Sequence, residues 1–221
     1  MAQASDLYRR LLSGIALAPL PVLIVLYHSA WLYGTALVAW GIMIAELGMM
    51  TGWRWRWLTP GFLYISWAVF AFIWLSESAA GKPLCFFLIS VPIAADICAY
   101  LVGRSVGGPR LAPTLSPRKT WSGLAGAVLG AAGAGAATLL LYPGGHLLPV
   151  IGMSLLLGFI EQGGDLLESL VKRRFGHKDS GRLIPGHGGL LDRLDGFLGV
   201  GFFLGLLQVA SGGRMTQWLW Q

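Results

Sequence analysis

The sequence has 221 residues, of which 55% are hydrophobic and only 12% are charged. Soluble domains are about 45–50% apolar and about 25% charged. This composition therefore excludes an ordinary soluble fold and indicates a chain whose main solvent is lipid. The formal net charge of +6 could suggest nucleic-acid binding, but the basic residues lie between apolar segments rather than along one groove. No nucleic-acid partner is expected.

The apolar segments are long enough to cross a membrane. A helix needs about 20 mostly apolar residues to cross a bilayer core of roughly 30 Å, and lipid offers no hydrogen-bond partner to an open backbone. Seven segments meet this requirement, at residues 11–27, 30–50, 57–75, 84–103, 121–142, 147–165 and 196–212. The predicted fold is all-α, a polytopic transmembrane helical bundle of about seven spans that forms a single membrane domain over residues 1–221.

Loop charge predicts the orientation of this bundle, because cytoplasmic loops near span ends are rich in Lys and Arg. With a cytoplasmic N-terminus, only Lys82 and Arg214 of the 16 basic residues fall on the outer side. This arrangement places the connection 166–195, which carries much of the charge and a cluster of glycines, on the cytoplasmic side. We expect this connection to carry the function.

Four carboxylates lie within or at the ends of the apolar segments, where an unpaired charge costs several kcal/mol. Asp96 and Asp165 lie toward predicted cytoplasmic ends, next to basic loops, which favours cation binding. Glu161 lies one turn before Asp165. Glu46 is isolated in the sequence, and two interpretations stay open for it: a structural acid that is protonated or paired with Arg, or a functional one.

The segment 164–173 has the spacing of a functional helix face. Asp165, Glu168, Ser169 and Lys172 follow at i, i+3, i+4 and i+7, so their side chains share one face of a helix. Such a face can hold a divalent cation together with an anionic phosphate. The alternative is a solvated amphipathic face with an ordinary Glu168–Lys172 pair.

The glycine-rich segment 185–189 follows, with the pattern Pro-Gly-x-Gly-Gly. Its backbone N–H groups can wrap phosphate oxygens as an anion nest. Asp192 and Asp195, three residues apart, point the same way if this segment opens the last helix. Together with Asp165 they offer hard oxygen ligands suited to Mg²⁺. Four basic residues would offset phosphate charge: Lys172, Arg173, Lys178 and Arg193.

These residues carry a resemblance to a known family. The segments SLVKR at 169–173, KDSG at 178–181 and IPGHGGLLDRLD at 184–195 resemble the signature of phosphatidate cytidylyltransferases, also called CDP-diacylglycerol synthases. Upstream, DICAYLVGR at 96–104 and LSPRKTWSG at 115–123 are similar to the same family, which usually has Glu where this chain has Ser122. The resemblance covers about residues 90–200, and the chain looks like a short form.

The resemblance implies a magnesium-dependent membrane enzyme that converts CTP and phosphatidic acid into CDP-diacylglycerol and pyrophosphate. It implies N-terminal spans in 1–89 and catalytic helices and loops in 90–212. It places the metal on Asp165 and Asp192, and leaves a second metal ion open. Asp165, Ser169, Lys172, Asp192 and Asp195 would be catalytic. The residues expected to bind substrate are Ser116, Lys119, Arg173, Lys178, His187, Gly188, Gly189 and Arg193.

Other interpretations stay open at this stage. A relative could transfer a cytidylyl or phosphoryl group to another lipid, such as an isoprenoid phosphate or a polyprenol. A transporter or channel could also use intramembrane acids, but it gives no reason for a glycine-rich nest beside paired acids. We expect membrane lipids as partners, a bacterial inner membrane as location and a cytoplasmic active site. A homodimer is left open.

Overall fold

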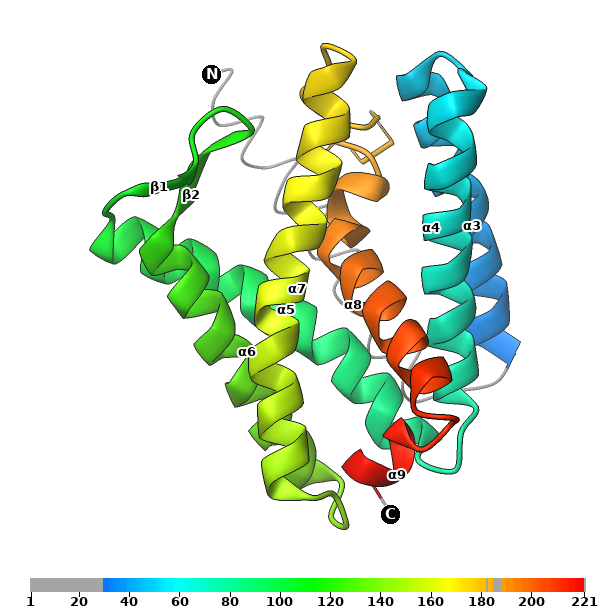
Figure 1. The fold of residues 1–221 in the computed structure, drawn as a ribbon, viewed down its shortest axis with the longest axis vertical. Helices are drawn as coiled ribbons and strands as arrows, with labels where there is room; N and C mark the ends of the chain where they lie inside the picture. The colour runs from blue at the N-terminus through cyan, green and yellow to red at the C-terminus, as the bar shows by residue number, and fades with distance from the viewer. Residues whose placement is uncertain (1–29, 182, 185–187, 221) are drawn as a thin grey trace. The chain divides into compact units, whose positions relative to one another are not determined.

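The computed structural model describes residues 30–181, 183, 184 and 188–220 (Figure 1). The predicted first span, at 11–27, and the site candidate His187 lie outside the described residues. The elements are α3 (Ala30–Thr51), α4 (Trp55–Ser76), α5 (Gly81–Val106), β1 (Arg110–Ala112), β2 (Ser116–Thr120), α6 (Trp121–Leu141), α7 (Leu147–Arg174), α8 (Leu191–Ala210) and α9 (Met215–Leu219).

The described part of the chain is helical and suited to a membrane. Six helices, α3 to α8, are long and apolar enough to span a bilayer, and the only sheet among the described residues is the two-stranded hairpin β1–β2. These helices correspond to the last six predicted spans. The prediction of an all-α polytopic membrane protein is confirmed.

At the functional connection the helices extend beyond the predicted apolar spans. α7 continues past the span end at 165 to Arg174, in agreement with the helical spacing of 164–173, because this amphipathic segment keeps leucines among its charged residues. It ends where the His177 N–H donates to the Lys172 carbonyl oxygen at 2.9 Å, a helix-terminating bond. α8 begins at Leu191, before the predicted span start at 196. The apolar pattern did not include this first turn because its acids lower its apparent hydrophobicity.

The chain divides into two compact units, each built from separate stretches of sequence. One unit contains Met1–Ser66 and Val171–Leu194, and the other contains Trp67–Leu170 and Asp195–Gln221. In the first unit, α3 packs on the part of α4 up to Ser66, where the Trp40 indole Nε1 donates to Ser66 Oγ at 2.9 Å. This contact anchors α3, which carries Glu46.

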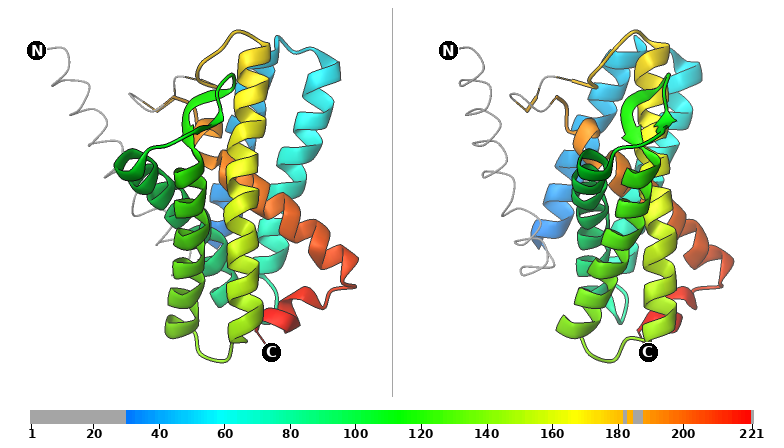
Figure 2. Two further views of the ribbon diagram at one scale, coloured as in Figure 1. Left: turned by 60° about the vertical axis from the view of Figure 1, so that its left-hand side comes forward. Right: turned by 90° about the vertical axis from the view of Figure 1, so that its left-hand side faces the viewer.

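In the second unit, α5 and α6 lie side by side (Figure 2). The helices are close because small residues line the contact: a Cβ at Gly126 would lie 2.7 Å from the Cys98 carbonyl oxygen. Close approach through small residues is the usual way helices associate in lipid. The glycine- and alanine-rich sequence of α6 therefore serves helix packing.

The hairpin β1–β2 joins α5 to α6 and was not predicted. Its second strand leads directly into α6, and the Thr120 side chain accepts a hydrogen bond from the Gly123 N–H at 3.0 Å. This is an N-cap, which satisfies one of the unpaired amides of the first helical turn. The hairpin thereby fixes the position of Lys119, the residue before the cap.

Candidate functional site

A buried ion pair joins the end of α7 to the start of α8 in the first unit. Lys172 Nζ lies 2.7 Å from Asp192 Oδ1, and the two side chains are only 10% and 7% exposed. Lys172 is in the last turn of α7 and Asp192 is in the first turn of α8. A buried charge needs a partner, so each of these groups depends on the other.

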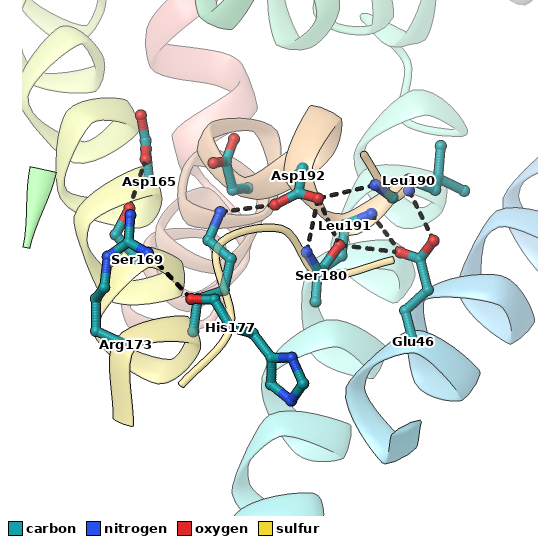
Figure 3. A network of polar contacts seen from close by, with 12 residues as sticks. Glu46, Asp165, Ser169, Arg173, His177, Ser180, Leu190, Leu191 and Asp192 are labelled. Atoms are coloured by element: carbon teal, nitrogen blue, oxygen red, sulfur yellow. Dashed lines mark hydrogen bonds and ion pairs between the residues drawn. The ribbon is translucent and has the colours of Figure 1, made fainter. Parts of the chain in front are cut away.

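The second oxygen of Asp192 holds the connecting loop (Figure 3). Asp192 Oδ2 accepts from the Ser180 N–H at 2.7 Å, the Ser180 hydroxyl at 2.9 Å and the Gly189 N–H at 2.8 Å. Gly188 has a φ of +86°, and a Cβ there would lie 2.6 Å from Asp192 Oδ2. Glycine is required at 188 both for its left-handed backbone and for this approach.

Glu46 belongs to the same network (Figure 3). Its carboxylate, on α3, is 3% exposed and accepts from the Leu190 N–H at 2.9 Å and the Leu191 N–H at 2.8 Å. The Ser180 hydroxyl lies 3.3 Å from Glu46 Oε2. A carboxylate on α3 therefore binds amides at the start of α8, which the helix itself leaves without acceptors.

These contacts also change the picture of the glycine-rich segment. The Gly189 amide, which belongs to the expected phosphate nest, and the following Leu190 and Leu191 amides donate to carboxylates of the chain itself. Residues 185–187 of the pattern lie outside the described part. Phosphate binding at Gly188 and Gly189 stays a prediction.

A separate polar cluster lies in the second unit, around Asp165. Lys119 Nζ, from β2, lies 2.5 Å from Asp165 Oδ2 and donates to Gln162 Oε1 at 2.7 Å. The Ser169 hydroxyl donates to Asp165 Oδ1 at 3.3 Å (Figure 3). Gln162 also donates through Nε2 to Glu161 Oε2 at 2.8 Å. The amide of Gln162 thus links the ammonium group to a second, buried acid.

Asp195, in the first turns of α8, lies near the acids of α7. Its carboxyl group interacts electrostatically with Asp165 and is hydrogen-bonded to Glu168. The carboxyl group of Asp195 on α8 therefore interacts with two acids of α7, Asp165 and Glu168. Such a group is stable only when protons or cations offset its charge.

The remaining predicted substrate-binding residues are mostly on the surface. Arg173, Lys178 and Arg193 are exposed, and Arg173 Nη1 donates to the His177 carbonyl oxygen at 3.1 Å. Ser116 is the first residue of β2 and is partly buried. Exposed basic groups of this kind remain accessible to phosphates in solution or at a membrane surface.

The structure therefore brings the predicted residues together in two groups. Lys172 meets Asp192 in one unit, and in the other Lys119 and Ser169 meet Asp165, which also acts on Asp195. The sequence did not predict that Gln162 and Ser180 take part, and it did not predict where Glu46 lies. The cost of a carboxylate in an apolar span was the only signal for Glu46, and it did not indicate a partner 144 residues away.

The fit of Mg²⁺ can be tested on the donor set. Among the described residues, no group of three or more His, Cys, Asp and Glu side chains is arranged to hold a metal ion. Mg²⁺ is commonly bound by only one or two carboxylates together with substrate phosphates, so a site of that kind needs no such group. The acids Asp165 and Asp195 supply oxygen donors of the right chemistry, with the ammonium of Lys119 as the present counter-charge on Asp165.

The helices and these two groups define a class: a polytopic membrane protein in which mostly buried acids are paired with ammonium groups. The sequence matches the Cytidylyltransferase family over residues 15–210. The chain belongs to this family of nucleotidyltransferases, which confirms the resemblance.

Individual relatives extend the match. The chain is 42% identical over 192 residues to a phosphatidate cytidylyltransferase of Brucella suis biovar 1 (strain 1330), covering 78% of this chain and 69% of that protein. It is 34% identical over 215 residues to a phosphatidate cytidylyltransferase of Rickettsia conorii (strain ATCC VR-613 / Malish 7), covering 94% and 93%.

Proposed function

We propose that this protein transfers the cytidylyl group of CTP to phosphatidic acid, forming CDP-diacylglycerol and pyrophosphate for phospholipid synthesis. The observation that carries the proposal is the match, over nearly the full length of both chains, to a protein named phosphatidate cytidylyltransferase. The Lys172–Asp192 pair, at the end of α7 and the start of α8, supports it, because a lipid phosphate and a nucleotide meet at a membrane surface.

The reaction needs no protein nucleophile. An oxygen of the lipid phosphate forms a bond to the α-phosphorus of CTP, the bond from that phosphorus to the oxygen bridging to the β-phosphate breaks, and pyrophosphate leaves with the electron pair. The chain's contribution is to position two anions that repel each other and to offset their charge. Lys119 and Lys172, whose ammonium groups are already held beside Asp165 and Asp192, are the groups we assign to this task.

We assign Mg²⁺ to Asp165 and Asp192, the predicted ligands. When bound, the metal supplies charge neutralisation on the triphosphate. Asp192 already accepts four hydrogen bonds, so its part in metal binding requires some of these bonds to be exchanged. Ser169 and Asp195 would support the metal site, while the exposed Arg173, Lys178 and Arg193 would bind phosphates.

We place the active site on the cytoplasmic side of a bacterial inner membrane. The proposal rests on the basic residues between α5 and α6 and at the end of α7, because such residues favour the cytoplasmic side. CTP is a cytoplasmic metabolite, so the same side gives access to substrate. A cytoplasmic N-terminus follows if the predicted first span crosses the membrane.

The proposal is tested by pyrophosphate release from CTP by the purified protein in mixed micelles, with and without phosphatidic acid and Mg²⁺. We expect release only when both are present. Release with an isoprenoid phosphate and none with phosphatidic acid would keep the nucleotide site and change the acceptor. No release with any lipid acceptor would contradict the proposal.

A further inference from the structure

Glu46 is a buried carboxylate that the proposed chemistry does not use. It lies on α3, outside the segments that resemble the family signature, and its side chain is 3% exposed. Its two oxygens accept from consecutive amides, Leu190 N–H and Leu191 N–H, at 2.9 and 2.8 Å. A buried carboxylate without donors would be strongly destabilising, so Glu46 depends on these two amides.

The donors of Glu46 lead directly to the Lys172–Asp192 pair. Leu191 is the residue before Asp192, so holding the Leu191 amide fixes the first turn of α8 from which the Asp192 side chain extends. The Ser180 hydroxyl lies 2.9 Å from Asp192 Oδ2 and 3.3 Å from Glu46 Oε2. Both carboxylates therefore hold Ser180 together with backbone amides of residues 189–191.

We propose that Glu46 is a positioning residue for the reaction: its carboxylate holds the start of α8 and Ser180 so that Asp192 stays beside Lys172. This inference rests on the proposed function for its catalytic consequence. Glu46 acts through other residues and does not contact the reacting groups. The loop glycines agree with this role, since a Cβ at Gly189 would lie 2.6 Å from both Glu46 oxygens.

The test compares Glu46→Gln with Glu46→Asp and with Thr51→Val as the matched control. Glutamine keeps the shape but replaces one acceptor oxygen with a donor, so one α8 amide loses its partner. Aspartate keeps the carboxylate on a shorter side chain. Thr51 is another buried polar residue of α3 whose hydroxyl bonds only to its own helix, at the Leu47 carbonyl oxygen.

Two measurements are made on each variant. Hydrogen exchange reports the segment 179–194, and steady-state kinetics in mixed micelles separates kcat from KM for CTP. For Glu46→Gln we expect the Leu190 and Leu191 amides to exchange roughly tenfold to a hundredfold faster, as the loss of charge-assisted hydrogen bonds predicts. We expect a kcat lowered by a similar factor and a KM changed by less than about threefold. Glu46→Asp should recover part of both effects, and Thr51→Val should resemble the wild type.

A second variant disturbs the same carboxylate without removing it. A Cβ at Gly181 would lie 2.7 Å from Glu46 Oε1, so Gly181→Ala should displace the Glu46 side chain and raise exchange at Leu190 and Leu191. If Glu46→Gln does not insert into the membrane, Gly181→Ala tests the positioning role in its place.

The outcomes separate this inference from the proposed function. Unchanged exchange at Leu190 and Leu191 in both variants would overturn the positioning role. Faster exchange spread evenly over α3 and α4 would overturn it as well, because it would show a general loss of stability. If the wild-type protein shows no cytidylyltransferase activity, the proposed function fails, whereas localised exchange would still establish that Glu46 holds this segment.

Discussion

Replacing Asp192 by Asn tests the buried Lys172–Asp192 ion pair, which organises the part of the site that lies in the first unit. The Lys172–Asp192 pair is 2.7 Å long and its side chains are 10% and 7% exposed. Removing one member of a buried pair costs about 3–5 kcal/mol, because the other charge is left without compensation. The amide also cannot accept all of the bonds that Ser180 and Gly189 donate to one oxygen. The loop should therefore leave its present position.

For Asp192→Asn we expect the initial rate of CDP-diacylglycerol formation in mixed micelles to fall by roughly a hundredfold or more. The variant should still insert into the membrane and should elute like the wild type in size-exclusion chromatography in detergent. The double variant Lys172→Met with Asp192→Asn removes both charges and should recover much of the lost thermal stability. Its activity should stay low, since both groups also serve the reaction. A rate near that of the wild type in Asp192→Asn would refute this reasoning.

Three further predictions concern Asp165, the metal and Ser122. Asp165→Asn should lower the rate by roughly a hundredfold or more while the protein still inserts, and near-normal activity would contradict the metal assignment. Chelation of divalent ions by EDTA should stop pyrophosphate release and added Mg²⁺ should restore it, whereas full activity in EDTA would exclude a metal requirement. Ser122→Ala removes the hydrogen bond to the Gly107 carbonyl oxygen, so we expect at most about 1 kcal/mol of lost stability and a rate within roughly threefold of wild type. A large loss of rate would show that Ser122 contributes to catalysis.

The helices could be predicted from the sequence because lipid imposes a simple requirement on each span. Mean apolarity over about 20 residues is enough to find them, and α3 to α8 were found in this way. At the site the apolar spans are shorter than the helices, because the charged residues of 165–174 and 191–195 interrupt the apolar segments but continue the helices. The spacing of Asp165, Ser169 and Lys172 predicted that continuation correctly, because it follows the period of the helix itself.

The contacts between distant segments could not be predicted. Nothing in the local pattern pairs Lys119 with Asp165, or Glu46 with the Leu190 and Leu191 amides, since these pairings depend on how helices far apart in sequence pack together. The backbone donors of this network carry no sequence signal, because every residue except proline has the same N–H group.

The most direct test of the proposed reaction follows the label of CTP into the lipid. The purified protein is supplied with phosphatidic acid and Mg²⁺, and with CTP labelled with ³²P at either the α- or the γ-phosphate, in parallel. We predict that α-label enters the chloroform-soluble fraction as CDP-diacylglycerol, while γ-label stays in the aqueous phase as pyrophosphate. Transfer of γ-label to lipid, or of no label from either position, would contradict cytidylyl transfer.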